Sequence, residues 1–342
     1  MLTKPNKLEI GDTIGIIAPS GSLASLVPHR LEAAKKNLEN LGFKVKLFPT
    51  TKLNDNGNAG TIGERIKDIH DAFLDKKVKA IICATGGISN NQLISKIDYN
   101  IIKENPKIFV GYSDTTILHY AFQKKAELVT FYGPCAITQF GEFPDVLEYT
   151  KNSFINTLVE GRTLGKIEPS EEWTSELLDW FQKLDLTRSR KLGKNSGYKW
   201  LKPGSAKANI VGGCLHSIAY LIGTDIDLDY TDKILFIETP EGKDFTKGEP
   251  IPYVEAQIVD LKNKGIFNKI KGLIVGRPFG YSDEEKTQFE EIIKEHLKEY
   301  NFPILINVDI GHTDPIITLP LGVNVTINSE ENTFSIDESG VI

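Results

Sequence analysis

The sequence predicts an α/β protein in which helices cover both faces of a parallel sheet. Two observations support this class. Short, continuous apolar runs alternate with segments whose apolar side chains recur at helical spacing. The apolar runs lack the polar alternation of half-exposed strands, as expected where helices bury both faces of a parallel sheet. Only the last part of the chain, residues 322–336, alternates apolar and polar side chains, which predicts a hairpin.

The first half supplies the alternating elements in order. Strands are expected at residues 13–18, 45–48, 78–84 and 107–110. Helices are expected at 27–41 and 63–76, and a further helix begins at Thr115 or Thr116.

The second half resumes the alternation after an irregular segment. A helix is expected after Gly212 and Gly213, strands at 233–238, 272–275 and 304–308, and helices at 253–264 and 284–300. Residues 168–203 are charged and irregular and contain all three tryptophans, which indicates a long connection or lid. We therefore divide the chain into an N-terminal domain (1–165), an aromatic connecting loop (166–207) and a C-terminal domain (208–342).

The composition excludes several classes of function. The chain has 342 residues, 40% hydrophobic and 25% charged, and a net charge of -6 without a basic block, so nucleic acid is not an expected partner. It shows no signal-peptide core and no membrane-length apolar run, which predicts a cytoplasmic protein without a membrane partner. The three cysteines form no CxxC pair and the six histidines show no metal-ligand spacing, so we expect no metal.

The turn at Ser113 is the most informative local feature. An apolar run ends at Gly111, Ser113 follows, and a helix then begins. This order can expose a hydroxyl at the top of a sheet, with free N–H groups of a helix N-terminus behind it. The alternative is a simple helix cap. The G-x-S-x-G elbow is also incomplete, because Thr115 stands where its second glycine would be.

Other strand ends carry candidate partners for this serine. His312 could act as the base and Glu238 as the acid that orients it, in the chain order Ser…Glu…His. His119 and His216 are competing bases; His119 is better explained by packing, and His216 could line a cleft. Thr85-Gly86-Gly87 could form an oxyanion hole or only a tight turn. Both residues could instead have no catalytic role: His312 could be a turn residue that bonds the backbone, and Glu238 a solvated or structural anion.

Together these residues resemble a known family, the serine peptidases that include LD-carboxypeptidases and microcin C immunity peptidases. The motifs that carry the resemblance are Leu8–Asp12, Ala18-Pro19-Ser20, Arg65, Asp68, Ala72-Phe73, Thr85-Gly86-Gly87, Gly111-Tyr112-Ser113-Asp114, Tyr132-Gly133-Pro134, Gly212-Gly213, Glu238-Thr239, Gly276-Arg277 and Gly311-His312.

The resemblance implies roles for several of these residues. Ser113 would be the nucleophile, His312 the general base and Glu238 its partner, with the backbone N–H groups of Gly87 and Asp114 as oxyanion hole. It implies a homodimer, a Rossmann-like N-terminal domain and a β-rich α+β C-terminal domain, with the triad assembled across the two. It implies no metal and no organic cofactor. The resemblance also implies that the serine turn of this family has the form Gly-x-Ser-Asp, so Thr115 in place of the second glycine does not argue against Ser113 as nucleophile.

Two subgroups of the family act on different substrates, a murein tetrapeptide or a microcin C-like aminoacyl adenylate. The aromatic connecting loop resembles the immunity branch, so we expect a small peptide or peptidyl-nucleotide substrate of that kind. Gly86, Trp173, Trp180 and His216 are the candidate substrate-binding residues; the tryptophans would stack on adenine or merely pin the loop. Cys214, where a small polar residue is expected, departs from the family pattern. A non-enzymatic sugar- or nucleotide-binding protein is the remaining alternative.

Overall fold

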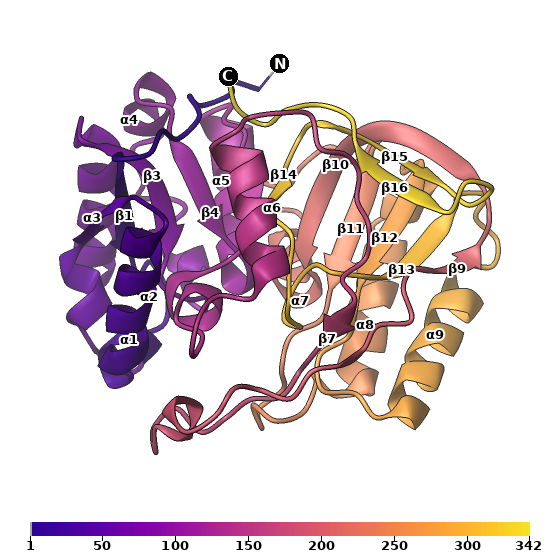
Figure 1. Cartoon of the computed structure of the whole chain (residues 1–342). Coiled ribbons are helices and arrows are strands. Elements are labelled where there is room, and N and C mark those ends of the chain that lie inside the picture. Colours follow the sequence, from indigo (N-terminus) through magenta and orange to yellow (C-terminus); the bar gives the residue numbers. More distant parts are fainter. Residues whose placement is uncertain (1) are drawn as a thin grey trace.

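Two β-sheets lie side by side, one built mainly from each half of the chain (Figure 1). The computed structural model describes residues 2–342. Both termini lie at the same end of the molecule, above the N-terminal sheet in the view of Figure 1. The predicted α/β class is confirmed.

The N-terminal sheet has the strand order β14-β5-β4-β3-β1-β2. Its strands are β1 (Thr13–Ile17), β2 (Lys44–Leu47), β3 (Val78–Cys83), β4 (Ile108–Gly111), β5 (Phe131–Tyr132) and β14 (Leu319–Pro320). The helices of this half are α1 (Leu23–Leu26), α2 (Pro28–Asn40), α3 (Ile62–Leu74), α4 (Tyr99–Glu104), α5 (Thr116–Lys125) and α6 (Glu148–Leu158). β1 to β5 pair in parallel, and β14 is antiparallel to β5.

Local sequence explains most of these elements. β4 is buried along its whole length, which is why its sequence is a continuous apolar run. α3 begins at a capping box in which Thr61 and Glu64 bond each other's backbone N–H groups. The sequence did not predict α4 and α6. α4 spans six residues, too few to show a helical period, and α6 buries only a narrow stripe that includes Phe154 and Leu158.

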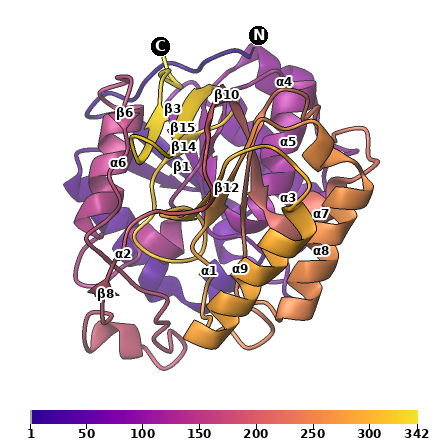
Figure 2. The ribbon, with the colours of Figure 1, turned by 90° about the vertical axis from the view of Figure 1, so that its right-hand side faces the viewer.

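The C-terminal sheet is mixed, with the order β6-β16-β15-β10-β11-β12-β13-β9. Its strands are β6 (Gly165–Lys166), β9 (Lys199–Lys202), β10 (Ser205–Cys214), β11 (Ile234–Glu238), β12 (Gly272–Gly276), β13 (Ile304–Val308), β15 (Asn324–Asn328) and β16 (Thr333–Ile336). Its helices are α7 (Leu215–Leu221), α8 (Ile251–Asn263) and α9 (Asp283–Leu297), which line one side of the molecule in Figure 2. β10 to β13 pair in parallel, while β15 and β16 form the predicted hairpin.

The two halves are joined by more than the covalent connection. β14 comes from the last part of the chain but pairs with β5 in the N-terminal sheet. At the start of α5, Thr116 Oγ1 accepts a hydrogen bond of 3.0 Å from the backbone N–H of Cys214 at the end of β10. The helix that follows Ser113 is therefore tied directly to the C-terminal sheet.

The irregular segment 168–203 is anchored on both halves. It contains the short strands β7 (Glu172–Trp173) and β8 (Gly193–Lys194), its end forms β9 of the C-terminal sheet, and part of it extends below the body in Figure 1. Arg190, in this segment, forms ion pairs of 2.7 Å with Glu142 and 2.8 Å with Asp314. Since Glu142 and Asp314 belong to different halves, Arg190 holds the segment against both.

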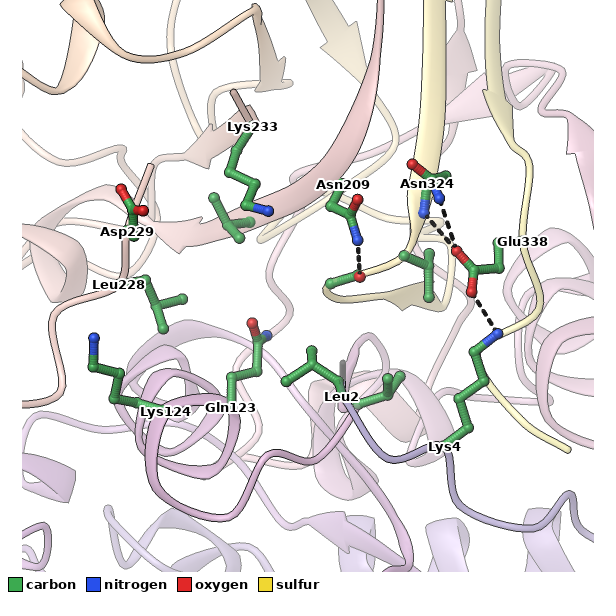
Figure 3. A pocket seen from close by; sticks show the side chains of 14 residues that line it. Leu2, Lys4, Gln123, Lys124, Asn209, Leu228, Asp229, Lys233, Asn324 and Glu338 are labelled. Atoms are coloured by element: carbon green, nitrogen blue, oxygen red, sulfur yellow. Dashed lines mark hydrogen bonds and ion pairs between the residues drawn. The ribbon is translucent and has the colours of Figure 1, made fainter. Parts of the chain in front are cut away.

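A cavity of about 530 Å³ lies between the halves at the far end of α5 from Ser113 (Figure 3). Gln123 and Lys124, at the C-terminal end of α5, line it together with Asn209 of β10. It contains none of the predicted catalytic residues, so it is separate from the candidate active site. Within residues 2–342, no helix combines the length and apolarity needed to span a membrane.

Candidate active site

Ser113 occupies a sharp turn between β4 and α5. Its φ of +65° lies in the left-handed region, which side chains other than glycine rarely adopt. A short 3₁₀ turn, Ser113–Thr115, then leads into α5 at Thr116. The backbone N–H of Ser113 donates a hydrogen bond of 3.1 Å to the Tyr132 hydroxyl. The strained conformation has the character of a nucleophile elbow, and a simple helix cap would not require it.

Glu238 and His312 meet at the ends of β11 and the loop after β13. His312 Nδ1 lies 2.6 Å from Glu238 Oε2, and Glu238 is completely buried. The Tyr132 hydroxyl donates a hydrogen bond of 2.5 Å to the other oxygen, Glu238 Oε1. Tyr132 therefore connects the acid of one half to the backbone of Ser113 in the other half.

Gly311 makes the close approach of Glu238 to His312 possible. Its φ is +101°, and a Cβ at this position would overlap the Glu238 carboxylate. A glycine is therefore required here by both backbone conformation and space.

The His312 side chain is positioned to act through Nε2. Nε2 is buried and makes no hydrogen bond within residues 2–342, and no hydrogen bond joins it to Ser113 Oγ. Catalytic hydrogen bonds often tighten only when substrate is bound. The nearest charged group is Glu241, whose Oε2 lies 3.5 Å from Nε2.

Burial and neighbouring carboxylates shift the pKa of both members of the pair. Burial by itself lowers the pKa of His312, but the charges of Glu238 and Glu241 and the hydrogen bond to Glu238 outweigh it and raise the pKa to about 9. Burial alone would raise the pKa of Glu238, but the His312 charge and the hydrogen bonds from His312 and Tyr132 hold it below its usual range. Glu238 is therefore ionised and stabilises the imidazolium form of His312.

The loop that carries His312 is fixed at both ends. On one side, Asp309 forms an ion pair of 2.9 Å with Arg277 and accepts a hydrogen bond of 2.8 Å from the Ser170 N–H. On the other, Asp314 pairs with Arg190 and accepts a hydrogen bond of 3.0 Å from Gln139 Nε2. The connecting segment supplies Ser170 and Arg190, so it helps to hold the imidazole in place.

The glycine loop after β3 packs directly against Ser113. A Cβ at Gly86 would collide with the Cβ and Oγ of Ser113. The N–H groups of Gly87 and Asp114 donate no hydrogen bond within residues 2–342; Asp114 directly follows the serine, and Gly87 follows the glycine that packs against it. These are the two N–H groups predicted for the oxyanion hole, where free backbone donors are required.

The side chain of Asp114 holds this loop in place. Its Oδ2 accepts hydrogen bonds of 3.0 Å from the N–H groups of both Ser89 and Asn90, and one of 2.5 Å from Ser20 Oγ. Arg65, which is also buried, donates a hydrogen bond of 3.0 Å to Ser89 Oγ. The Gly-x-Ser-Asp sequence thus couples the serine turn to the glycine loop through its aspartate.

The two competing histidines have different surroundings. His119 is fully buried, and its Nε2 lies 2.9 Å from the Gly111 carbonyl oxygen, as expected for a packing role. His216 is half-buried, with its Nδ1 3.8 Å from Cys214 Sγ and its Nε2 without a hydrogen-bond partner in the described chain. Neither histidine contacts Glu238 in the way that His312 does.

Two of the three tryptophans of the connecting segment, Trp173 and Trp180, are covered by cations. The Arg277 guanidinium lies 4.8 Å from the ring centre of Trp173, and the Arg30 guanidinium lies 4.1 Å from that of Trp180. These contacts attach the segment to the body of the protein. Lys286 Nζ also lies 5.2 Å from the ring centre of Trp173, so two cations contact Trp173 and one contacts Trp180.

Sequence reasoning did not assign a role to Tyr132, Glu241 or the Asp114 carboxylate. The sequence feature that could have indicated Tyr132 is its position at the end of a strand, directly before Gly133 and Pro134. Glu241 follows Glu238 by three residues beyond a strand end, where catalytic side chains gather in open α/β sheets.

Comparison with known proteins places this arrangement in a family. The family model for the LD-carboxypeptidase N-terminal domain matches residues 14–133, and that for the LD-carboxypeptidase C-terminal domain matches residues 207–327. A Bacillus subtilis protein described as a probable murein peptide carboxypeptidase is 32% identical over 342 residues, covering 99% of this chain and 95% of its own. The Escherichia coli microcin C7 self-immunity protein MccF is 30% identical, covering 97% and 94%.

Comparison with solved structures supports the same family. MccF in the wild-type apo state superposes with a TM-score of 0.92 at 30% identity, covering 99% of this chain and all of that one. MccF has also been solved with aspartyl sulfamoyl adenosine. An MccF-like protein from Bacillus anthracis gives a TM-score of 0.88 at 33% identity, covering 98% of this chain and 99% of that one. The chain belongs to the LD-carboxypeptidase family of serine hydrolases.

Proposed function

We propose that this chain cleaves an amide bond with Ser113 as nucleophile, His312 as general base and Glu238 as the acid that orients the base. The observation that supports the proposal best is the buried contact of 2.6 Å between His312 Nδ1 and Glu238 Oε2. It leaves Nε2 of the same ring free to take a proton. A serine hydroxyl requires such a base, because it is a weak nucleophile on its own.

The proposed reaction follows the acyl-enzyme route. His312 Nε2 takes the proton of Ser113 Oγ as the oxygen attacks the scissile carbonyl carbon. The N–H groups of Gly87 and Asp114 stabilise the oxyanion that forms. His312 then protonates the leaving nitrogen, the C–N bond breaks, and water releases the acyl group by the same steps in reverse order.

For the substrate, we propose an aminoacyl group joined by an amide-type bond to a nucleotide-like leaving group, as in microcin C-like toxins. MccF, the relative solved with aspartyl sulfamoyl adenosine, is similar to this chain over nearly its full length. The segment 168–203 carries Trp173 close to the loop of His312, because the adjacent Thr174 exchanges two backbone hydrogen bonds with Asp314. Trp180, which a single cation contacts, can offer its other face to a base.

A murein tetrapeptide is the second candidate substrate. The observation in its favour is the 32% identity to the probable murein peptide carboxypeptidase of Bacillus subtilis, which is slightly above the 30% identity to MccF. In this case the leaving group is a terminal D-amino acid, and the same triad would cleave the bond before it.

The test offers both compounds to the same enzyme preparation. Aspartyl sulfamoyl adenosine and a murein tetrapeptide are incubated separately with the protein, and products are followed by chromatography and mass spectrometry. We expect release of sulfamoyl adenosine with the higher kcat/KM. The reverse preference would assign the protein to murein recycling.

The matched control is Ser113→Ala. This variant keeps the fold, as checked by circular dichroism, and loses at least about a thousandfold in kcat on whichever substrate is cleaved. A fluorophosphonate probe should label the wild-type protein at Ser113. Full activity in the Ser113→Ala protein would rule out the proposed mechanism.

A further inference from the structure

Cys214 places a thiol beside the candidate catalytic pair, Glu238 and His312. This residue ends β10 and lies opposite Glu238, the last residue of β11, in the parallel register of the two strands. Cys214 and Glu238 are both completely buried, and His312 is 8% exposed. One ligand atom from each of Cys214, Glu238 and His312 can be chosen so that all three lie within 4.8 Å of one another.

The three residues offer ligand types that zinc sites use, and their ligand atoms are close enough to converge on one ion after a small adjustment. Thiolate, imidazole and carboxylate are the ligands that proteins use for Zn²⁺, at about 2.0–2.3 Å from the metal, which puts tetrahedral ligands about 3.3–3.6 Å apart. The contact of 2.6 Å between His312 Nδ1 and Glu238 Oε2 is a hydrogen bond at present and would open by less than about 1 Å. His216 Nδ1, 3.8 Å from Cys214 Sγ, is the nearest additional nitrogen donor to the thiol.

The charges also match a buried divalent cation. With Cys214 as thiolate and Glu238 as carboxylate, the two negative charges neutralise Zn²⁺, so no net charge is buried. A hard cation such as Mg²⁺ prefers oxygen ligands and would gain little from a thiolate and an imidazole. The site therefore discriminates between the two kinds of metal.

We propose that Cys214, Glu238 and His312 form an inhibitory binding site for Zn²⁺ or a similar thiophilic divalent cation. On binding, the Cys214 thiol releases its proton to solvent. The protonated His312 ring releases the Nδ1 proton and keeps the Nε2–H bond. Metal binding at Nδ1 leaves Nε2 without a lone pair, so it can no longer accept the proton of Ser113.

The test uses metal-free protein and a binding measurement that does not depend on activity. Zn²⁺ is titrated in competition with a chromophoric chelator, and Co²⁺ is added separately to look for thiolate-to-metal charge-transfer absorption. We expect one Zn²⁺ per chain and a charge-transfer band with Co²⁺. In Cys214→Ser the affinity for Zn²⁺ should fall at least about a hundredfold and the band should disappear.

Cys135→Ser is the matched control, because Cys135 is another completely buried cysteine and lies outside the three-residue cluster. It should bind both metals like the wild type. In an activity assay, Zn²⁺ should inhibit the wild type and Cys135→Ser but not Cys214→Ser, and Mg²⁺ should inhibit none of them. Failure of the wild type to bind Zn²⁺ at large molar excess, or unchanged binding in Cys214→Ser, would overturn the proposal.

Discussion

Glu241 should control the pH at which the enzyme works. Its Oε2 lies 3.5 Å from His312 Nε2, the nitrogen that must be unprotonated to accept a proton from Ser113. The charges of Glu238 and Glu241 contribute to the raised His312 pKa of about 9, so at neutral pH most of the free enzyme carries a protonated base. Glu241→Gln removes one of these charges and keeps the size of the side chain.

The size of the effect follows from Coulomb's law. Two unit charges 3.5 Å apart interact by about 1.2 kcal/mol at the dielectric constant of water, which corresponds to a pKa change of about 0.9. The value for water is appropriate because the Glu241 side chain is 33% exposed and is screened by solvent. At the effective dielectric constant of a protein surface, the change would be larger.

The assay is the pH dependence of kcat/KM, which reports the pKa values of the free enzyme. Wild-type activity should rise with pH as His312 loses its proton near pH 9. In Glu241→Gln this rise should move down by about one pH unit, with about sevenfold higher activity at pH 7.5 and no difference well above pH 9.

The control is Asp244→Asn, on the same loop, because the Asp244 carboxylate bonds Thr246 and forms no ion pair with His312. Its pH profile should match that of the wild type. If Glu241→Gln leaves the rise in place, or moves it to higher pH, the electrostatic account of His312 is wrong.

Three further substitutions test the positioning of the catalytic groups. Tyr132→Phe removes the hydrogen bond to ionised Glu238, worth about 1.5–3 kcal/mol, so kcat should fall at least about tenfold while KM changes little in steady-state assays. An unchanged kcat would show that this hydrogen bond does not position Glu238 for catalysis. Gly86→Ala places a methyl group against Ser113 and should reduce probe labelling and kcat, whereas normal labelling would show that the loop can shift. Arg190→Ala removes the only ion pair that buried Asp314 forms within residues 2–342 and the shorter of the two ion pairs of buried Glu142, which keeps Arg30 at 3.8 Å, and should cost about 3 kcal/mol in urea unfolding. Replacing Glu142 by Gln in the same protein should recover part of this loss, and no recovery would contradict the ion-pair account.

The sequence predicted the catalytic candidates because each is marked locally. Ser113 follows an apolar strand, Glu238 ends another, and His312 lies in a glycine-bounded loop after a third. In parallel sheets the carboxyl ends of strands gather ligands and catalytic groups, so position along the chain already indicates position in space. The structure brings Glu238 and His312 into contact as this rule predicts.

Contacts across the two halves could not be predicted in this way. Tyr132 lies in the N-terminal sheet but bonds Glu238 of the C-terminal sheet, and its strand β5 also pairs with β14 from the end of the chain. No local pattern specifies that pairing. The same limit explains the metal site: Cys214, Glu238 and His312 are far apart in the chain, and ligand spacing finds only ligands that are close in sequence.

The structure also explains why Thr115 can replace the second glycine of the usual serine elbow. Thr115 is fully buried, and its side chain fills the space over Gly111, where a Cβ would collide with it. The small residue required at the junction of strand and helix is therefore supplied by the strand, in Gly111. The space around the Ser113 hydroxyl is kept open from another direction, by Gly86 of the neighbouring loop. A serine elbow requires open space around the serine, and glycines at different positions can provide it. The G-x-S-x-G motif describes only one of these arrangements.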